Sequence, residues 1–340
     1  MKEYSKKLIC VVLALCMFVS LFSGCGRKKY EQNGELPTYE PTTKENADNG
    51  VDNGTGKRNH LTGLNTLSPE AVNKKPVCIF TENSIKATSQ RGISTPDIVV
   101  QDIDGDKVKY AFMYADLKNI PRVDNVSSPT GNLFEIMGSM DSIFVYNGES
   151  EKVNSFANKA KLIKYNMGSD SISDGKVIET ELKKQSADTK IKSSSLLPFG
   201  FTNSVRVPFG HLSGDCPAIS MVFSYDMTQT FKYNADEKVY TGYINNNEIK
   251  DGNNNNVAKY TNLILLYCQK KEDGSWDFSK GGGALYISNG YGERDNWRKD
   301  SDTSPLRIYG KDGKLLTINR GKTWIGIVDD NNRHMTNIER

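Results

Sequence analysis

The pattern of apolar and polar positions divides the chain into three parts. An uncharged apolar run, "LICVVLALCMFVSLF" at residues 8–22, follows three lysines. Residues 26–58 are polar and poor in aliphatic side chains, a composition that cannot bury enough apolar surface to offset the entropy lost on folding. From residue 59 onward, apolar residues recur at spacings typical of strands and helices. The pattern predicts an N-terminal targeting segment, a flexible tether and a folded part.

Strands and helices alternate along residues 59–165, which indicates a mixed or partly parallel sheet in an N-terminal α/β domain. Phe156, Ala160 and Ile163 have helical spacing and indicate an amphipathic helix across residues 148–165. The other expected elements are a strand at 76–81, a hairpin at 97–114 that turns at Asp104-Gly105, a helix within 131–140 and a strand within 141–147.

The second half of the chain has a different pattern. Residues 166–213 are rich in Ser, Lys and Asp and predict a loop-rich connection. Residues 214–330 contain short strand-like runs separated by Asn, Asp and Gly, which favour a β-rich, mainly antiparallel C-terminal domain. Residues 331–340 are expected to form a tail. The fold class expected from the whole pattern is α+β.

The apolar run at residues 8–22 has the features of a secretory signal peptide. It is several residues shorter than the about 20 that cross a bilayer, and the small residues Ser23 and Gly24 follow it. The stretch "FSGC" resembles the lipobox of bacterial lipoproteins, with Phe22 where that motif more often has Leu. This resemblance implies removal of residues 1–24, acylation of Cys25 with palmitate-type chains, and a lipid anchor outside the cell membrane. An uncleaved helix with an incidental cysteine is the alternative.

Charge and cysteine content exclude several protein classes. The chain has 44 basic and 41 acidic residues, and loss of three Lys and one Glu with residues 1–24 leaves 41 and 40. This balance offers no basic surface for nucleic acid. Besides Cys25, the mature chain keeps Cys78, Cys216 and Cys268, an odd number that does not suit a disulfide framework. No CxxC pair occurs, so we expect neither a zinc site nor another metal or cofactor.

Several long stretches of the folded part carry a family resemblance. They are "KKPVCIFTENSIKATSQRGISTPDIV" and "DSIFVYNG" in the first half, and "FSYDMTQTFKY", "GGGALYISNGYGERDNWRKD" and "SPLRIYGKDGKLLTINRGKTWIGIV" in the second. With these stretches the chain resembles the YerB-like lipoproteins of Gram-positive bacteria. The resemblance implies a lipid-anchored α+β protein with a distinct β-rich C-terminal part, and it implies no reaction. Where the family usually has two arginines and a histidine, this chain has Ser127, Thr130 and Tyr146. If the family site is a basic anion pocket, this chain has lost much of it.

The residues retained after the first strand are the first candidate site. Asn83, Ser84, Lys86 and Gln90 follow "PVCIFTE", and ligands in open α/β sheets usually bind at the C-terminal ends of strands. Asn, Ser and Gln can donate and accept hydrogen bonds, and Lys86 can attract an anion. An equally good alternative is a loop that these side chains hold together through bonds to its own backbone.

A second candidate surface lies in "GYGERDNWRKD". Aromatic and cationic side chains occur together near a turn there, a mixture that suits a binding surface. The residues are Tyr291, Arg294, Trp297 and Arg298. Trp324 in "RGKTWIGIV" is instead expected to be packed in the interior.

Two other constellations suggest chemistry, but simpler explanations are favoured for both. "GHLSGDC" brings His211, Ser213, Asp215 and Cys216 together, and an imidazole can activate a thiol. Family members are usually shorter here, so we expect a non-catalytic polar loop. "QDIDGD" places three aspartates at alternate positions, 102, 104 and 106. We expect a hairpin turn with solvated acids rather than a calcium loop, because the late acidic ligand is missing.

The favoured interpretation is a non-catalytic binding or scaffold module of the cell envelope. Its expected partners are the bilayer, through acylated Cys25, and an unidentified envelope ligand or protein. The alternative is an envelope enzyme that acts on cell-wall material, with unassigned carboxylates or with Cys216 and His211.

The lipoprotein interpretation predicts that Cys25→Ser abolishes membrane retention, because two acyl chains anchor stably whereas a polar side chain does not. Cell fractionation and the size of the precursor on a gel measure this, with Cys78→Ser as the matched control. Unchanged membrane retention and unchanged processing of the Cys25→Ser chain would contradict the interpretation.

Overall fold

The computed structural model describes residues 56–339, except 139, 149–150, 160–161, 169–171, 192–196, 209–215 and 302–303. These described residues belong to one compact unit. Cys25, the expected signal peptide and the expected tether up to residue 55 lie outside the described residues. No helix in the described part is both long and apolar enough to cross a membrane.

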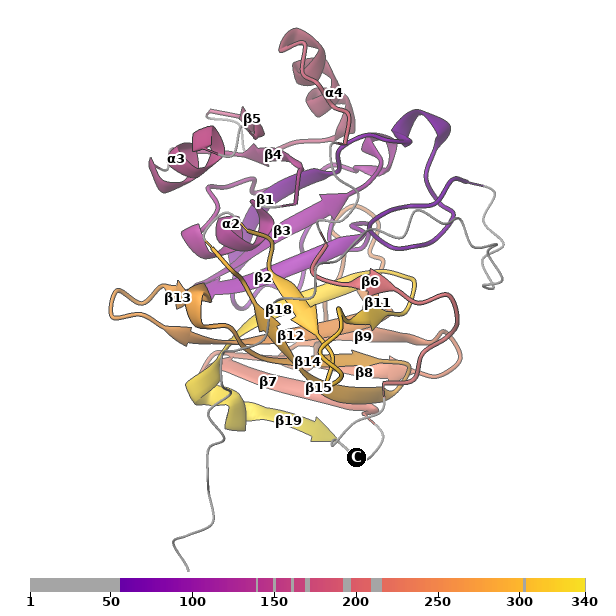
Figure 1. Ribbon diagram of the computed structural model, residues 1–340, viewed down its shortest axis with the longest axis vertical. Coiled ribbons are helices and arrows are strands. Elements are labelled where there is room, and N and C mark those ends of the chain that lie inside the picture. The colour runs from indigo at the N-terminus through magenta and orange to yellow at the C-terminus, as the bar shows by residue number, and fades with distance from the viewer. Residues whose placement is uncertain are drawn as a thin grey trace, which may run out of the picture. The chain divides into compact units, whose positions relative to one another are not determined.

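A central mixed sheet of eleven strands dominates the described part of the chain (Figure 1). Its order is β16-β15-β14-β12-β18-β2-β3-β1-β4-β5, with β13 beside β12. The strands are β1 Val77–Ser84, β2 Ile98–Asp104, β3 Lys107–Tyr114, β4 Ile143–Tyr146, β5 Ile163–Asn166, β12 Asn262–Lys270, β13 Trp276–Asp277, β14 Gly282–Ser288, β15 Tyr291–Arg298, β16 Arg307–Tyr309 and β18 Thr323–Asp329.

Strand β18 joins the two halves of the chain into this one sheet. It runs parallel to β12 on one side and parallel to β2 on the other, so that Trp324 pairs with both Leu263 and Val99. In the first half, β1 pairs antiparallel with β3 and parallel with β4, which confirms the mixed sheet expected there. The two parts distinguished along the sequence therefore share their main sheet.

A second, antiparallel sheet packs against the central one. Its order is β10-β9-β8-β7-β19, with β11 beside β9. Residues 331–339, expected as a tail, contribute to it, because the 3-10 segment η4 Asp330–Met335 leads into β19 at its edge. The strands are β7 Ala218–Ser224, β8 Met227–Asn234, β9 Val239–Ile244, β10 Asn247–Glu248, β11 Lys259–Tyr260 and β19 Thr336–Glu339; β6 Gly200–Phe201 and β17 Thr317–Ile318 form a short separate pair.

Helices are few, so the described chain is mostly β rather than an even mixture. The expected hairpin, the helix within 131–140 and the strand within 141–147 are confirmed. The expected helix across 148–165 ends early, and Ile163 begins strand β5 instead. A helix that the sequence did not predict, α4, interrupts the loop-rich connection. The helical elements are α2 Gly131–Met137, α3 Glu151–Lys159 and α4 Gly175–Lys184, with 3-10 segments η1 Pro69–Ala71, η2 Leu117–Asn119 and η3 Phe278–Lys280.

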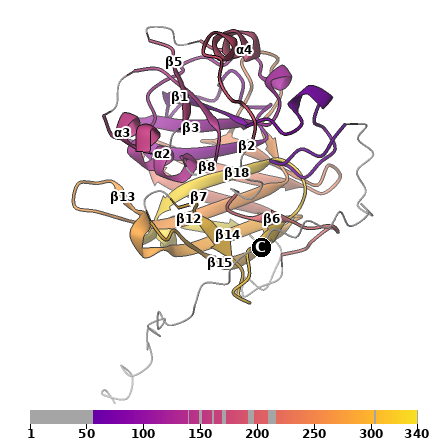
Figure 2. The same ribbon diagram turned by 45° about the horizontal axis from the view of Figure 1, so that its top comes forward.

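The central sheet buries both of its faces, because successive side chains of a strand point to opposite sides. In β1, Cys78 and Phe80 face α2 and α3, whereas Val77 and Ile79 face the cluster formed with the second sheet and α4. Figure 2 shows α2, α3 and α4 near β1 and β3. This two-sided burial explains why runs such as "PVCIF" and "NLILLYC" are continuously apolar.

Trp324 of the central sheet packs against the second sheet. It is 1% exposed, and its ring centroid lies 4.7 Å from that of Phe231 in β8. The expectation that Trp324 is packed in the interior is confirmed, and its Nε1 donates to Gln101 Oε1 of β2 at 3.3 Å.

We predict that Trp324→Ala lowers the free energy of unfolding by about 3–5 kcal/mol, because a large cavity opens between the sheets. Tyr225→Ala, at a fully exposed position, is the control and should change it by less than about 0.5 kcal/mol. Urea unfolding followed by circular dichroism measures both. A Trp324→Ala chain as stable as the control would contradict the packing described.

Candidate functional site

The predicted ligand residues after β1 hold their own loop together. Gln90 is 4% exposed. Its Oε1 accepts from Asn83 Nδ2 at 2.8 Å, and its Nε2 donates to Asp124 O at 3.2 Å. Ser84 Oγ accepts from the Lys86 backbone at 3.3 Å. These hydrogen bonds within the loop are of the kind that the structural alternative expects. The ligand role of the four residues stays a prediction.

The same loop is also fixed to the second half of the chain. Asp251 accepts from Gly92 N at 3.0 Å and from Ser94 Oγ at 2.7 Å. Burial acts to raise the pKa of Asp251, but hydrogen bonds from Asn253, Gly92 and Ser94 outweigh it and lower the pKa. Lys86 pairs at the surface with Asp226, at 3.0 Å. The loop is therefore a contact between the halves of the chain.

The residues of the second candidate surface lie on opposite faces of β15, because successive side chains of a strand alternate between its two faces. Trp297 is 2% exposed and donates from Nε1 to Tyr267 O at 3.0 Å. Arg294 and Arg298 occupy even positions of β15 and so point to the face opposite Tyr291 and Trp297. The Arg298 guanidinium stacks over Tyr309, 4.2 Å from the ring centroid. The four residues do not share one surface.

The thiol in "GHLSGDC" lies in the interior. Cys216 is 1% exposed, and burial raises its pKa to about 12. The group is therefore a protonated thiol at neutral pH, which is not a nucleophile. His211, Ser213 and Asp215 lie outside the described residues. Cys78 and Cys268 are buried free thiols too, as expected.

The three aspartates of "QDIDGD" were expected to be exposed to solvent, and one of them is buried. Asp104 and Asp106 are exposed, but Asp102 is buried and accepts from Trp276 Nε1 at 2.9 Å. The expectation of a solvated acid is wrong for Asp102 because β2 is covered on both faces. Thr130 also donates to Asp102, at 3.2 Å, and its Oγ1 caps α2 by accepting from Leu133 N. The described residues contain no group of three or more potential metal ligands.

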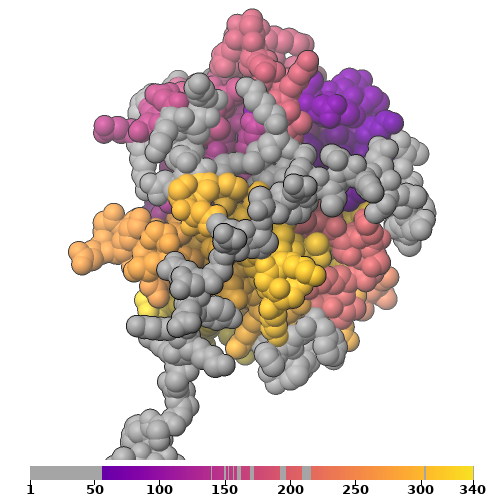
Figure 3. Space-filling model, viewed as in Figure 1, coloured from indigo at the N-terminus to yellow at the C-terminus, as the bar shows by residue number. Residues whose placement is uncertain are grey.

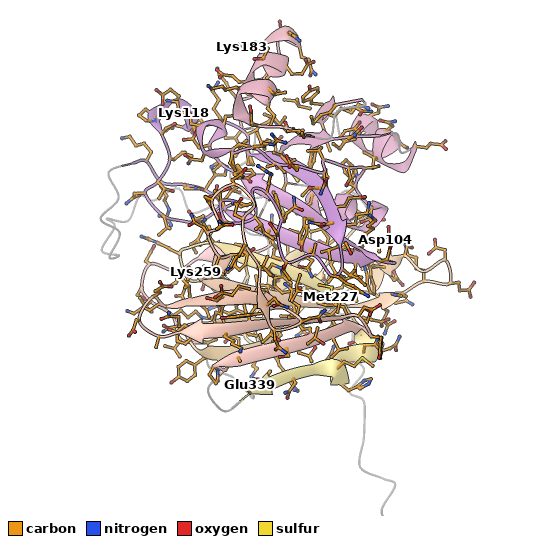
Figure 4. All side chains as sticks on the ribbon, turned by 180° about the vertical axis from the view of Figure 1, so that it is seen from behind. Asp104, Lys118, Lys183, Met227, Lys259 and Glu339 are labelled. Atoms are coloured by element: carbon orange, nitrogen blue, oxygen red, sulfur yellow. The ribbon has the colours of Figure 1, made fainter. Side chains whose placement is uncertain are left out.

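A cavity of about 850 Å³ lies between α4, η1, η2 and the start of β4; we call it the α4 pocket. Figure 3 shows the α4 region meeting the indigo segment that carries η1, and Lys118 and Lys183 of the pocket lie at the same end of the described residues in Figure 4. Its apolar floor consists of Ala71, Ala115, Leu117, Ile120, Ile143, Leu182 and Ala187. None of the predicted ligand residues lines it.

Close approach of the backbone positions α4 beside this cavity. A Cβ on Gly175 would lie 2.1 Å from Leu117 O, so only glycine lets the first turn of α4 reach η2. Asp174 caps the helix and accepts from Lys176 N at 2.9 Å and Val177 N at 3.0 Å. Ile178 and Leu182, four residues apart, form the buried face of the helix.

Four of the six cations that line the α4 pocket are in ion pairs, while the lining carboxylates Asp116 and Asp174 accept backbone N–H groups as caps and pair with no cation among the described residues. Ion pairs join Lys118 to Glu70 at 2.9 Å and Lys183 to Glu179 at 2.8 Å; Arg122 pairs with Asp124, and Lys75 with Asp141. The Lys74 ammonium donates to the Thr189 hydroxyl, at 3.2 Å, and makes no ion pair with any described residue. Lys176 makes no ion pair with any described residue. Two ammonium groups at the pocket thus lack a carboxylate.

A separate buried carboxyl pair lies on β15, away from the α4 pocket. Glu293 and Asp295 are 6% and 4% exposed, and Asp295 Oδ2 has no hydrogen-bond partner among the described residues. Arg206 Nη2 lies 2.5 Å from Glu293 Oε1. Burial and the Glu293 carboxylate raise the pKa of Asp295 to about 7, although Arg206 and Lys311 oppose the shift. One proton on Asp295 would relieve both the repulsion and the missing hydrogen bond.

Comparisons with known proteins place this geometry in a family. Residues 61–191 match the model described as "Protein of unknown function (DUF3048) N-terminal domain", and residues 219–325 match the corresponding C-terminal domain. The chain belongs to the DUF3048 family. The whole lining of the α4 pocket falls within the N-terminal match, while the central sheet runs through both DUF3048 domains.

A relative and a solved structure support this assignment. The chain is 24% identical over 305 residues to "Putative lipoprotein YerB" of Bacillus subtilis (strain 168), covering 79% of this chain and 86% of that protein. The crystal structure of the YerB protein from Bacillus subtilis matches with a TM-score of 0.67 at 21% identity, covering 82% of this chain and 98% of that chain. The resemblance to the YerB-like family is thus confirmed, and the structural match establishes the fold.

The carboxyl pair of this DUF3048 chain predicts a pH-dependent stability. The folded pKa of Asp295 is raised, so its folded form binds more protons than the unfolded chain between about pH 4 and 7, and stability falls as pH rises through that window. Asp295→Asn should remove this loss. Between pH 5 and pH 8, the free energy of unfolding should therefore fall by about 2–4 kcal/mol less in the variant than in wild type.

Urea unfolding at pH 5 and pH 8 measures this difference. Asp236→Asn, an exposed position in the turn before β9, is the control and should keep the wild-type pH profile. An Asp295→Asn chain with that same profile would mean that Asp295 is ionised in the folded state at both pH values.

Proposed function

We propose that this DUF3048 protein is a lipid-anchored binding module outside the cell membrane, and that its ligand occupies the α4 pocket. The location is supported by Cys25 after a short apolar run and by the lipoprotein name of the Bacillus subtilis relative. Composition predicts that residues 26–58 act as a tether, which at about 5–6 Å × √n would hold the folded part some 30 Å from the bilayer on average.

The α4 pocket is the observation that carries the binding role. Ligand sites in proteins are concave, about 300–1,000 Å³ in volume and mainly apolar, with a few polar groups that fix orientation. The α4 pocket has about 850 Å³, an apolar floor and a rim of lysines. Lys74 and Lys176 supply the cationic groups at its rim that have no ion-pair partner among the described residues.

The enzyme alternative, an envelope enzyme acting on cell-wall material, has less support. The buried Cys216 is held as a thiol, and burial lowers the pKa of His60 to about 4, so its imidazole is neutral at physiological pH. The carboxyl pair of Glu293 and Asp295 is the arrangement closest to acid–base machinery. It lies beneath Arg206 and does not line the α4 pocket.

Blocking the α4 pocket tests the proposal. Ala187 lines the pocket and is half-buried, so Ala187→Trp should fill the floor without opening the core. The chain is incubated with an envelope extract and re-purified, and the small molecules that it releases on denaturation are identified by mass spectrometry. We predict a released ligand from wild type and at least about tenfold less from Ala187→Trp.

Ala235→Trp is the matched control, because Ala235 lies in an exposed turn far in sequence from the pocket residues. It should release as much ligand as wild type. Equal release from Ala187→Trp and from the control would place the ligand elsewhere, and no release from any of the three chains would contradict a binding role.

A further inference from the structure

We infer that the ligand of the α4 pocket is an anionic amphiphile, with one carboxylate or phosphate group at the lysine rim and an apolar chain on the floor. This inference rests on the proposed function and names the ligand class. It follows from three features of the described residues: the composition of the floor, the two ammonium groups without an ion-pair partner, and the use of the pocket's two remaining carboxylates, Asp116 and Asp174, as caps that accept backbone N–H groups of η2 and α4.

The floor of the α4 pocket continues into the interior of the protein. Ile143 and Leu182 belong to the apolar cluster on one face of the central sheet, and Ala71 belongs to the cluster on the other face. Ile120 and Ala115 complete this floor from the two ends of η2. This apolar floor is favourable for an alkyl chain and unfavourable for water, because transfer of apolar surface out of water drives binding.

The rim supplies positive charge where the floor ends. Lys74 comes from the turn after η1, and Lys176 comes from the first turn of α4. Lys176 does not stabilise the helix, because a cation is disfavoured near a helix N-terminus. The first N–H groups of α4 already donate to Asp174, so the lysine ammonium groups, and not the helix end, would hold the anion.

The pairing of the other rim charges narrows the choice of ligand. Lys118 and Lys183 are neutralised by Glu70 and Glu179, so a polyanion would have to break existing ion pairs. A free inorganic anion would leave the apolar floor in water, and a neutral apolar molecule would leave both lysines unpaired. One negative group attached to an apolar chain satisfies the floor and the rim together.

The predicted anchor makes such molecules accessible. A chain attached through Cys25 stays close to a bilayer, where fatty acids and lysophospholipids share the inferred chemistry. These two sources differ in the headgroup, a carboxylate for the first and a phosphate for the second, so they can be separated by direct binding measurements.

The experiment uses the full mature chain from residue 25 with Cys25→Ser, without detergent, and four probes in calorimetry: palmitate, palmitoyl-lysophosphatidylglycerol, hexadecanol and inorganic phosphate. We predict that palmitate, the lysophospholipid or both bind at least about tenfold more tightly than hexadecanol or phosphate. The tighter of the two identifies the headgroup. Inorganic phosphate or hexadecanol that binds as tightly as the tighter of the two anionic amphiphiles would overturn the inference.

Charge variants then test the rim. The double change Lys74→Gln with Lys176→Gln should weaken binding of the anionic probe about tenfold and leave hexadecanol unchanged. The matched control is Lys184→Gln with Lys190→Gln, because both lysines are exposed, neighbour the pocket residues in sequence and do not line it. Equal weakening in both pairs would show a nonspecific charge effect and contradict the assigned rim.

The outcomes separate this inference from the proposed function. If Ala187→Trp abolishes release of an envelope ligand but no anionic amphiphile binds, the α4 pocket keeps its role and the ligand class is wrong. If no envelope ligand is released and no probe binds, the binding role fails as well.

Discussion

The parallel pairing of β18 with β2 is the constraint on which the rest of the structure depends. Strand β18 comes from the end of the chain, yet it lies between β12 and β2 and completes the sheet for both halves. Without it, β2 would be a long apolar edge that invites association. A Cβ on Gly326 would lie 2.1 Å from the Trp324 ring, so this strand tolerates its tryptophan only with glycine two residues later. Strand β18 thus determines both the register of the central sheet and the contact of Trp324 with the second sheet.

The α4 pocket lies at the other end of this framework, beyond the short strands of the first half. Its walls come from a helix, two 3-10 segments and the first residue of β4. The close contact of Gly175 with Leu117 and the capping of α4 by Asp174 hold the helix beside the sheet without filling the space beneath it. The floor therefore combines Ile143 of the central sheet with apolar residues in and beside α4, η1 and η2, and the charged rim comes from the same part of the N-terminal DUF3048 domain. Binding groups are often carried in this way on loops over a rigid scaffold.

The sequence predicts the strands of the interior well and the candidate site poorly, for physical reasons. Strands buried on both faces leave continuous apolar runs, so β1 and the β2–β3 hairpin are visible in the pattern. The pairing of β18 with β2 leaves no local signal, because it joins residues more than 200 positions apart. Helix α4 had signals, an Asp174 cap and Ile178 and Leu182 at helical spacing, but they lie within a Ser- and Lys-rich segment. Trp297 and Arg298 show a sequence signal that misleads. Neighbouring residues on a strand point to opposite faces, so aromatic and cationic residues that follow one another in β15 do not form one surface.

The central claim, that the α4 pocket rather than the loop after β1 receives the ligand, is tested most directly by nuclear magnetic resonance. Backbone amide shifts are recorded while the released envelope ligand, or palmitate, is titrated into the mature chain. The account predicts changes that saturate at residues 70–75, 115–122 and 174–189, with residues 83–94 unaffected. Shift changes confined to residues 83–94 would contradict it and return the site to Asn83, Ser84, Lys86 and Gln90.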